Sequence, residues 1–401
     1  MSDVLGPEPG TDTGTGSGRR ALLAAAGAAL ACGGATAGGG CAAPSGGAAR
    51  VAGAAGARGK RSSAASGPES ARGFHGARQA GIRTAQTARV SVVAFDLDPG
   101  VRGAAGAARL RTVLVAWTKY LAAETAARPG LEATVGIGPG LPAKVGVRAP
   151  ALLRELPAFP GDRLADRWSG GDLVVQMGAP GADAAGRAVD GLTGLGRGVL
   201  RPRWRQVGFL PDHGAGRTPR NLLGFKDGTV NPTPAESERW VWVPSGADRD
   251  GSYLVVRRIR LLVDRFAALS PSRQEAIIGR HRASGAPLGH DEEHEPIDLF
   301  AKTPEGRYVL PADAHVRLAH SRLDGGARML RRGYSYRDGP QDQGLLFLAY
   351  MKDPAIFVRV QERLAASDAL GKFTVHEGSG VYFALPGAPP GSSLGERLFG
   401  T

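Results

Sequence analysis

Three short segments carry side chains that could do chemistry at a bound group. In the first, Asn221–Pro232, Asp227 stands between Gly224 and Gly228. Glycines on both sides of an acid let the backbone approach a flat ligand closely, and the carboxylate would then lie over that ligand. The alternative is an ordinary Asp-Gly turn without chemistry. Taken alone, this segment favours the turn.

The second and third segments offer a histidine and an arginine. His315 follows a turn at 311–313, and a neutral imidazole is a common iron ligand. A lone histidine is more often a structural residue. In Met329–Tyr336, Arg331 and its neighbour enter an aromatic run. This run is either a solvated edge strand or a means of aiming one guanidinium at an anion. Taken singly, both segments favour the structural interpretation.

The elements that must position these residues read as two α+β units. Alternating and helically spaced apolar residues predict, in order, a strand at 90–95, a helix at 110–127, strands at 131–138 and 172–177, a helix at 182–195 and a strand at 199–209. This order is the ferredoxin-like pattern. A second copy is predicted from a strand at 254–263, a helix at 272–280, a strand at 344–350, a helix at 355–364 and a strand at 380–386.

The boundary between the two units is expected around residues 212–222. The stretch from about 285 to 335 contains His, Gly, Pro and charged residues but little periodicity. Loops of that length inside a compact domain are usually functional. The segments with His315 and Arg331 lie in or beside this stretch, which favours a site there.

Composition excludes several classes of function. The net charge is +13 over 401 residues, but the basic residues form no stripe or run, so a nucleic-acid partner is not expected. Both cysteines, Cys32 and Cys41, precede the predicted fold. The folded body therefore has no cysteine nucleophile, no thiolate-ligated haem and no cysteine-based zinc site.

The N-terminus is expected to be an export signal. Arg19-Arg20 precedes an apolar run of about eleven residues, too short for a bilayer span of about 20. Ala35-Thr36-Ala37 then matches a cleavage site, so residues 1–37 read as a twin-arginine signal peptide. A random alanine-rich tail is the main alternative, and a lipoprotein anchor through a cysteine is weaker. Residues 38–88 are expected to be a disordered linker. We therefore expect a periplasmic, cell-envelope or extracellular location.

Taken together and in this order, the three segments resemble those of the dye-decolourising (DyP-type) haem peroxidases. The resemblance extends to further motifs at Thr134–Gly140, Ser169–Leu173, Arg201–Gln206, Ile278–Gly289 and Gly344–Tyr350. It covers roughly residues 88–390. It is nearest to the twin-arginine-exported branch, which includes the deferrochelatase/peroxidases.

This resemblance implies an α+β fold with two ferredoxin-like domains, antiparallel sheets and the dimeric α+β barrel type. The domains would span 89–215 and 216–395, and the second would hold one b-type haem. His315 would be the proximal iron ligand, with Asp227 and Arg331 on the distal side. The expected haem-lining residues are Gly228, Thr229, Val230, His315, His320, Ser321, Arg322 and Arg331.

The implied activity is oxidation of organic substrates such as phenols and dyes by hydrogen peroxide. The alternatives are a deferrochelatase that releases iron from haem, or a haem carrier without turnover. The twin-arginine translocase would be a partner during export, and a homo-oligomer is compatible with the family. A distal carboxylate can move a proton between the two peroxide oxygens, and a fixed guanidinium favours the anion formed.

Two departures from the family pattern affect the proximal side. His320 lies five residues after His315 and could contact a haem propionate or compete as ligand, although His315 is favoured. Lys372 stands where relatives often carry an acid. The proton acceptor for the proximal imidazole would then be Asp368, Glu377 or a backbone carbonyl. A weaker acceptor there would reduce electron donation by the imidazole.

Two further groups have a functional and a structural interpretation. Histidines and acids gather in one segment and could hold a metal, but a charged surface loop is favoured; they are His281, His290, Asp291, Glu292, Glu293, His294 and Glu295. Four aromatic residues could relay electrons to bulky substrates, but core packing is favoured; they are Trp240, Trp242, Tyr334 and Tyr336.

Overall fold

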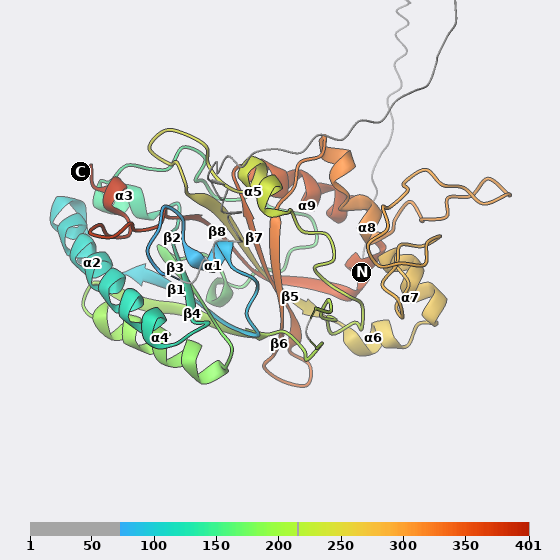
Figure 1. The fold of residues 1–401 in the computed structure, drawn as a ribbon, viewed down its shortest axis with the longest axis horizontal. Coiled ribbons are helices and arrows are strands. Elements are labelled where there is room, and N and C mark those ends of the chain that lie inside the picture. Colours follow the sequence, from blue (N-terminus) through green and yellow to red (C-terminus); the bar gives the residue numbers. More distant parts are fainter. Residues whose placement is uncertain (1–72, 215, 401) are drawn as a thin grey trace, which may run out of the picture. The chain divides into compact units, whose positions relative to one another are not determined.

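Strands from both halves of the chain close into one antiparallel barrel (Figure 1). The computed structural model describes residues 73–214 and 216–400. The strands are β1 (Arg89–Leu97), β2 (Glu132–Ile137), β3 (Leu173–Ala179), β4 (Leu200–Phe209), β5 (Ser252–Leu261), β6 (Leu330–Arg337), β7 (Gln343–Met351) and β8 (Thr374–Ala384). The α-helices are α1 (Ala80–Arg83), α2 (Gly103–Ala127), α3 (Leu141–Val145), α4 (Ala182–Leu195), α5 (Pro234–Trp240), α6 (Val263–Ala267), α7 (Pro271–Ile278), α8 (His315–Leu318) and α9 (Ala355–Ser367). Short 3₁₀ turns are η1 (Asp166–Trp168), η2 (Ser321–Asp324), η3 (Ala369–Phe373) and η4 (Glu396–Leu398).

Each half of the barrel has the ferredoxin-like strand order. The first half runs β4-β1-β3-β2 and the second runs β6-β7-β5-β8. The halves meet where β2 pairs with β8, and where Phe209 of β4 pairs with Ser335 of β6. These contacts close the barrel, although the seam between β4 and β6 is a single residue pair. The predicted fold class is confirmed.

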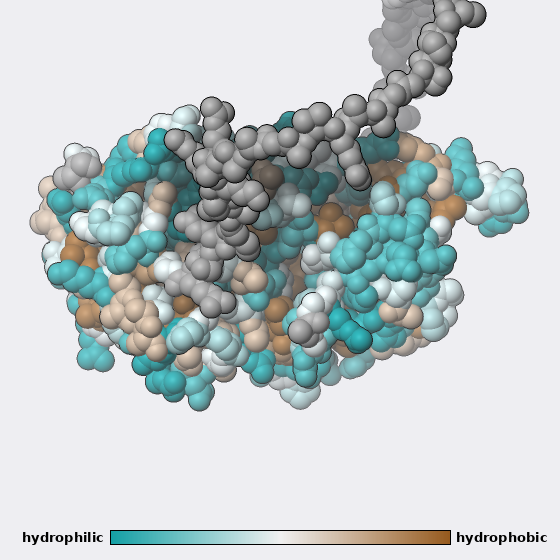
Figure 2. Space-filling model, in the orientation of Figure 1, coloured by the Kyte–Doolittle hydropathy of each residue, from teal (hydrophilic) through white to brown (hydrophobic). Residues whose placement is uncertain are grey.

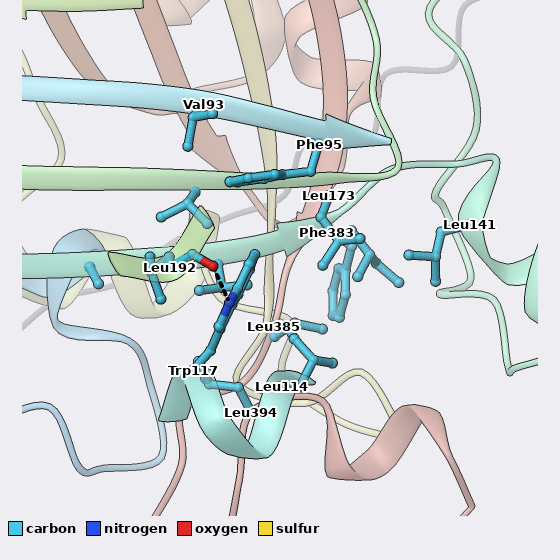
Figure 3. Close-up of a cluster of buried hydrophobic side chains, with 14 of the residues drawn as sticks. Val93, Phe95, Leu114, Trp117, Leu141, Leu173, Leu192, Phe383, Leu385 and Leu394 are labelled. Atoms are coloured by element: carbon cyan, nitrogen blue, oxygen red, sulfur yellow. Dashed lines mark hydrogen bonds between the residues drawn. The ribbon is translucent and has the colours of Figure 1, made fainter. Parts of the chain in front are cut away.

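The two faces of the strands pack into separate apolar clusters. On β1, Val93 and Phe95 pack with the helices, whereas Val92 and Ala94 belong to the other cluster, because side chains alternate along a strand. Trp117 of α2 is fully buried on the helix side, and its Nε1 donates a hydrogen bond to the Leu192 carbonyl of α4 at 2.9 Å (Figure 3). This bond joins the two helices of the first half over their sheet.

A buried arginine ties the strands of the second half together. Arg258 of β5 bonds to carboxylates of Asp338, Asp342 and Glu377. Its guanidinium also stacks on Tyr336, with 4.2 Å to the ring centroid. Tyr336 belongs to the same interior cluster as Trp242 and Tyr334, all of them buried. These aromatic residues therefore serve as core, the structural interpretation favoured above.

Most of the predicted elements are present, with shifted ends. The predicted helix at 182–195 matches α4, while the one at 110–127 begins at Gly103 in α2. The glycine- and alanine-rich start of α2 lacks the apolar spacing that marks a helix in the sequence. The strand predicted at 380–386 in fact begins at Thr374. Its first residues were missed because most of them are polar and only partly buried, so they lack the apolar pattern of a strand.

The predicted linker at 38–88 is wrong in its last part. Residues 73–88 belong to the folded body, because Gln79 and Ile82 are buried. The Gln79 side chain donates to the carbonyls of Val135 and Leu385, both at 2.8 Å, and so joins strands of the two halves. The predicted signal peptide at 1–37 and the rest of the linker lie outside the described residues. None of the described helices has the length and apolar character that a membrane span requires.

One half-buried histidine gives a pH-dependent prediction for stability. The Nδ1 atom of His376 on β8 is enclosed without a hydrogen-bond partner among the described residues. Burial, with the nearby charge of Arg257, lowers the pKa of His376 from 6.5 to about 3. The native protein therefore binds this proton less well than the unfolded chain, so stability present above pH 6.5 is lost as the pH falls toward 3.

Replacing His376 by Gln removes this titration. Between pH 6.5 and pH 5 we expect the parent to lose up to about 2 kcal/mol of unfolding free energy relative to the variant. Urea denaturation of both proteins at the two pH values measures this difference. The same pH dependence in both proteins would show that His376 does not titrate on unfolding.

Candidate functional site

The distal loop, which we define as residues 218–231, is fastened to the edge of β6. Arg331 pairs with Ala349 of β7 on one side, but β4 reaches β6 only at Ser335. Asn231 takes the place of a partner strand on that open edge. Its Nδ2 donates to the Arg331 carbonyl at 2.9 Å, and its Oδ1 accepts from the Arg331 amide at 3.0 Å. Both backbone groups of Arg331 on this edge are thereby satisfied.

The same contact orients the Arg331 side chain. Its Nη2 donates to the Val230 carbonyl at 3.0 Å, so the guanidinium lies along the distal loop. Within the described part of the chain no carboxylate pairs with this guanidinium. Its positive charge is therefore available to an anion.

Asp227 lies over β6 beside Arg331. A Cβ added at Gly333 would be 3.5 Å from the Asp227 carboxylate, so the acid packs against the strand where there is no side chain. Gly333 and Arg331 are two residues apart and so face the same side of β6. The Asp227 amide donates to the Pro219 carbonyl at 2.9 Å, and Gly228 follows with a φ of 101°. Because a side chain rarely adopts that φ, glycine is needed to complete the turn.

His315 begins α8 and has one nitrogen anchored. Its Nδ1 lies 2.7 Å from Oδ2 of Asp368, whose side chain is 7% exposed. The other carboxylate oxygen accepts from the Leu370 amide at 2.9 Å, and the Ala369 amide donates to the Asp313 carbonyl. With the proton of Nδ1 directed at Asp368, Nε2 keeps its lone pair and can bind a metal.

The three residues share one electrostatic environment. Burial lowers the pKa of the His315 imidazole, but the charge and hydrogen bond of Asp368 outweigh burial, and the pKa is raised. The charges of Arg331 and Asp227 also act on this imidazole, in opposite directions. A histidine, an acid and an arginine predicted from separate segments are thus brought together by α8, the distal loop and β6.

These residues suit a flat group that carries iron. The imidazole remains 32% exposed although its Nδ1 is bonded, so its free edge is open to a ligand. Val230 of the distal loop is 49% exposed, which leaves an apolar surface beside Arg331. An imidazole ligand and an apolar wall suit a haem, and an unpaired cation suits an anion bound beside it.

The remaining predicted haem-lining residues occupy two segments. Gly228, Thr229 and Val230 are in the distal loop, next to Asp227. His320, Ser321 and Arg322 form the turn after α8. The His320 Nδ1 accepts from the Arg322 amide at 3.2 Å and so caps η2. Its pKa is lowered by burial and then by the charges of Arg328 and Arg322. His320 has no carboxylate partner among the described residues, which favours His315 as the ligand.

The structure identifies the proton acceptor that the sequence left open. It is Asp368, four residues before Lys372, and Glu377 is instead engaged by Arg258 and Arg260. Asp368 is one of the three acceptors that the sequence left open, and because it is a carboxylate, the reduced electron donation of a weaker acceptor does not arise. The available signal was the position of Asp368 as the N-cap of η3, where an acid is common.

The histidines and acids at 281–295 do not form a metal site. No group of three potential ligands converges anywhere in the described ranges. His281 instead bonds to Glu275 at 3.2 Å, and His290 bonds to Glu295 at 2.8 Å. The charged-loop interpretation is favoured for most of these residues. Glu293 is the exception, because it binds the distal loop.

Comparison with known proteins relates both halves of the chain to one family. Residues 79–210 match the family model described as Dyp-type peroxidase, N-terminal, and residues 218–389 match Dyp-type peroxidase, C-terminal. A dye-decolorizing peroxidase of Thermobifida fusca is 39% identical over 80% of this chain and 84% of its own length. A deferrochelatase of Escherichia coli K12 is 34% identical over 78% and 84%.

Solved structures give the same relation. The oxyferrous complex of DtpA from Streptomyces lividans has a TM-score of 0.77 and 38% identity, covering 82% of this chain and 97% of that chain. A DyP-type peroxidase from Streptomyces coelicolor has a TM-score of 0.77 and 36% identity, with the same coverage.

The proximal geometry predicts different effects for the two histidines. Replacing His315 by Ala removes the imidazole whose Nδ1 is held by the Asp368 carboxylate and whose Nε2 is left for a metal, so haem bound per chain should fall at least about 10-fold. His320→Ala should keep the haem content of the parent, because this residue caps a turn. The pyridine haemochromogen assay, normalised to protein, measures both. Loss of haem from the His320 variant alone would assign the ligand to His320.

Proposed function

This chain belongs to the Dyp-type peroxidase family, and from that premise we propose that Asp227 and Arg331 form its distal pair and His315 its iron ligand. The protein is a haem peroxidase that reduces hydrogen peroxide and oxidises an organic donor. What remains to be assigned is the part each residue of this chain plays.

The haem, when bound, supplies the iron to which peroxide binds and the oxidising equivalents that the donor later removes. Asp227 takes the proton from one peroxide oxygen and returns it to the other, so that water can leave. The Arg331 guanidinium stabilises the negative charge that develops during this transfer. His315 would hold the iron through Nε2. The hydrogen bond from its Nδ1 to Asp368 increases the electron donation of the imidazole.

One arrangement carries this proposal: the Asp227 carboxylate and the Arg331 guanidinium, which pairs with no carboxylate of the described residues, lie together over β6. Neither Asp227 nor Arg331 is needed to hold haem in place. Their presence on one face of β6 is explained by a reaction that moves a proton and creates an anion. It also disfavours a carrier without turnover.

Replacement of either distal residue should separate haem binding from reactivity. We expect Asp227→Asn and Arg331→Ala to bind haem as the parent does and to react with peroxide about 10²–10⁴ times more slowly. Stopped-flow recording of the Soret band after mixing with peroxide measures the rate. Arg337→Ala, at the exposed end of the same strand, is the matched control and should keep the parent rate. Parent rates in both distal variants would refute the assignment.

Release of iron from haem is the second candidate function. Its support is the likeness to deferrochelatases, which are 34–35% identical over most of their length. The two functions differ in product, because iron release leaves a fluorescent protoporphyrin whereas peroxidase turnover does not. Incubating the protein with haem without peroxide, and recording porphyrin fluorescence, would distinguish them.

We also propose export by the twin-arginine translocase to the periplasm, cell envelope or exterior. Arg19-Arg20 and the apolar run that follows support this route. Replacing both arginines by Lys should keep the protein in the cytoplasmic fraction, and unchanged fractionation would refute it.

For the folded part we propose domains at 89–215 and 216–395, of which the second supplies His315, Asp227 and Arg331.

A further inference from the structure

We propose that Glu293 is a positioning residue that holds the distal loop so that the Asp227 carboxylate lies over the peroxide site. This inference rests on the proposed role of Asp227 and extends it to a residue in a different segment. Glu293 stands in an acidic run after α7, where the two preceding acids, Asp291 and Glu292, are exposed. Its own side chain is only 14% exposed.

The carboxylate of Glu293 binds the distal loop at three points. Its Oε1 accepts from the hydroxyl of Thr229 at 3.0 Å and from the hydroxyl of Thr218. Its Oε2 accepts from the ammonium of Lys226. Lys226 and Thr229 stand on either side of the Asp227-Gly228 pair, and Thr218 is at the start of the loop. The Glu293 side chain therefore binds the residue immediately before Asp227 and the residue immediately after Gly228.

The hydrogen bonds of Glu293 to the distal loop are made by a charged carboxylate. Burial raises the pKa of the Glu293 carboxyl, but the hydrogen bonds from Lys226, Thr218 and Thr229 outweigh burial, and the pKa is lowered. The carboxylate is therefore charged at neutral pH. Hydrogen bonds to an ionised group are shorter and roughly twice as strong as those between neutral groups.

Glu293 is itself held by a rigid neighbour. Nη1 of the buried Arg280 donates to the Glu293 carbonyl at 3.0 Å and to the Gly285 carbonyl at 2.6 Å. The loop around Gly285 packs closely on the distal loop, because a Cβ at Gly285 would lie 2.6 Å from Cδ of Lys226. The segment that carries Glu293 is thus fixed by Arg280 and by packing against the distal loop.

The Asp227 carboxylate depends on the bonds of Glu293 to the distal loop because it has no partner of its own. Within the residues that the structure describes, no hydrogen bond or ion pair holds the carboxylate, and only the Asp227 amide is bonded, to the Pro219 carbonyl. The loop backbone therefore determines where the acid lies. That backbone is anchored after Asp227 by Asn231 and around it by Glu293. A displacement of 1 Å at a reacting group can lower a rate about 10²-fold.

Glu293→Ala tests the proposal, with Glu292→Ala as the matched control. Glu292 is the adjacent acid and is exposed, and its replacement by Ala removes the same charge as Glu293→Ala. We expect Glu293→Ala to slow the reaction with peroxide by about 10- to 100-fold while haem content stays at the parent value. We also expect weaker binding of fluoride to the ferric protein, because bound fluoride needs the distal groups in place. Glu292→Ala should match the parent in both measurements.

Combination with Asp227→Asn separates positioning from a general structural effect. If Glu293 acts through Asp227, Glu293→Ala should change the peroxide rate less than about twofold in the Asp227→Asn background. An equal effect in both backgrounds, or parent behaviour of Glu293→Ala alone, would overturn the inference. A parent rate in Asp227→Asn alone would instead overturn the proposed function on which it rests.

Variants on the loop side provide a second route if Glu293→Ala does not fold. Lys226→Met and Thr229→Val remove the same contacts from the opposite partner. Each should slow the peroxide reaction with haem content unchanged, and Glu293→Gln should fall between the parent and Glu293→Ala. The amide of Gln keeps an oxygen for the threonine hydroxyls but places N–H groups toward the Lys226 ammonium. Parent rates in both loop-side variants would overturn the inference.

Discussion

The pairing of the Asn231 side chain with the backbone of Arg331 is the contact on which the distal side of this site depends. β6 closes the barrel through a single residue pair with β4, so its edge at Arg331 is left without a partner strand. Asn231 satisfies that edge with both of its polar atoms. The same contact brings the distal loop onto the strand, directs the Arg331 guanidinium along the loop and places Asp227 above Gly333. The contact that satisfies the open edge of β6 is therefore the same contact that assembles the distal side of the site.

The proximal side is built from short irregular elements that hold each other. The four-residue helix α8 begins at His315, and η3 begins directly after Asp368. Asp368 serves η3 as a cap with one oxygen and His315 as a proton acceptor with the other. Figure 1 shows α8 and α9 on the same side of the barrel sheet, and Figure 2 shows hydrophilic and hydrophobic residues interspersed over the face turned to the viewer. A rigid acceptor on an otherwise irregular segment keeps the imidazole in one orientation.

The sequence predicted the barrel strands better than the contacts of the site. Strands such as β1 were predictable because their apolar residues are continuous, and helix α4 because its apolar residues recur at helical spacing. The start of α2 was missed because glycine and alanine carry no such pattern. Asp227, His315 and Arg331 were predicted from the order of their motifs along the chain, which can be read without knowing how far apart the residues lie in the fold. Asp368 was one of three candidate acceptors, but it lies 53 residues from His315, and the sequence alone does not choose among the three. Glu293 was hidden in a run of acids, of which only burial distinguishes it.

We expect one face of a bound haem to meet His315 and the other to meet Asp227 and Arg331. A crystal structure of the haem-loaded ferric protein with fluoride bound tests it most directly. The account predicts iron bonded to Nε2 of His315, with Asp368 still on Nδ1, and fluoride within hydrogen-bond distance of Asp227 or Arg331. Iron bonded to His320, or fluoride on the face away from Arg331, would contradict it.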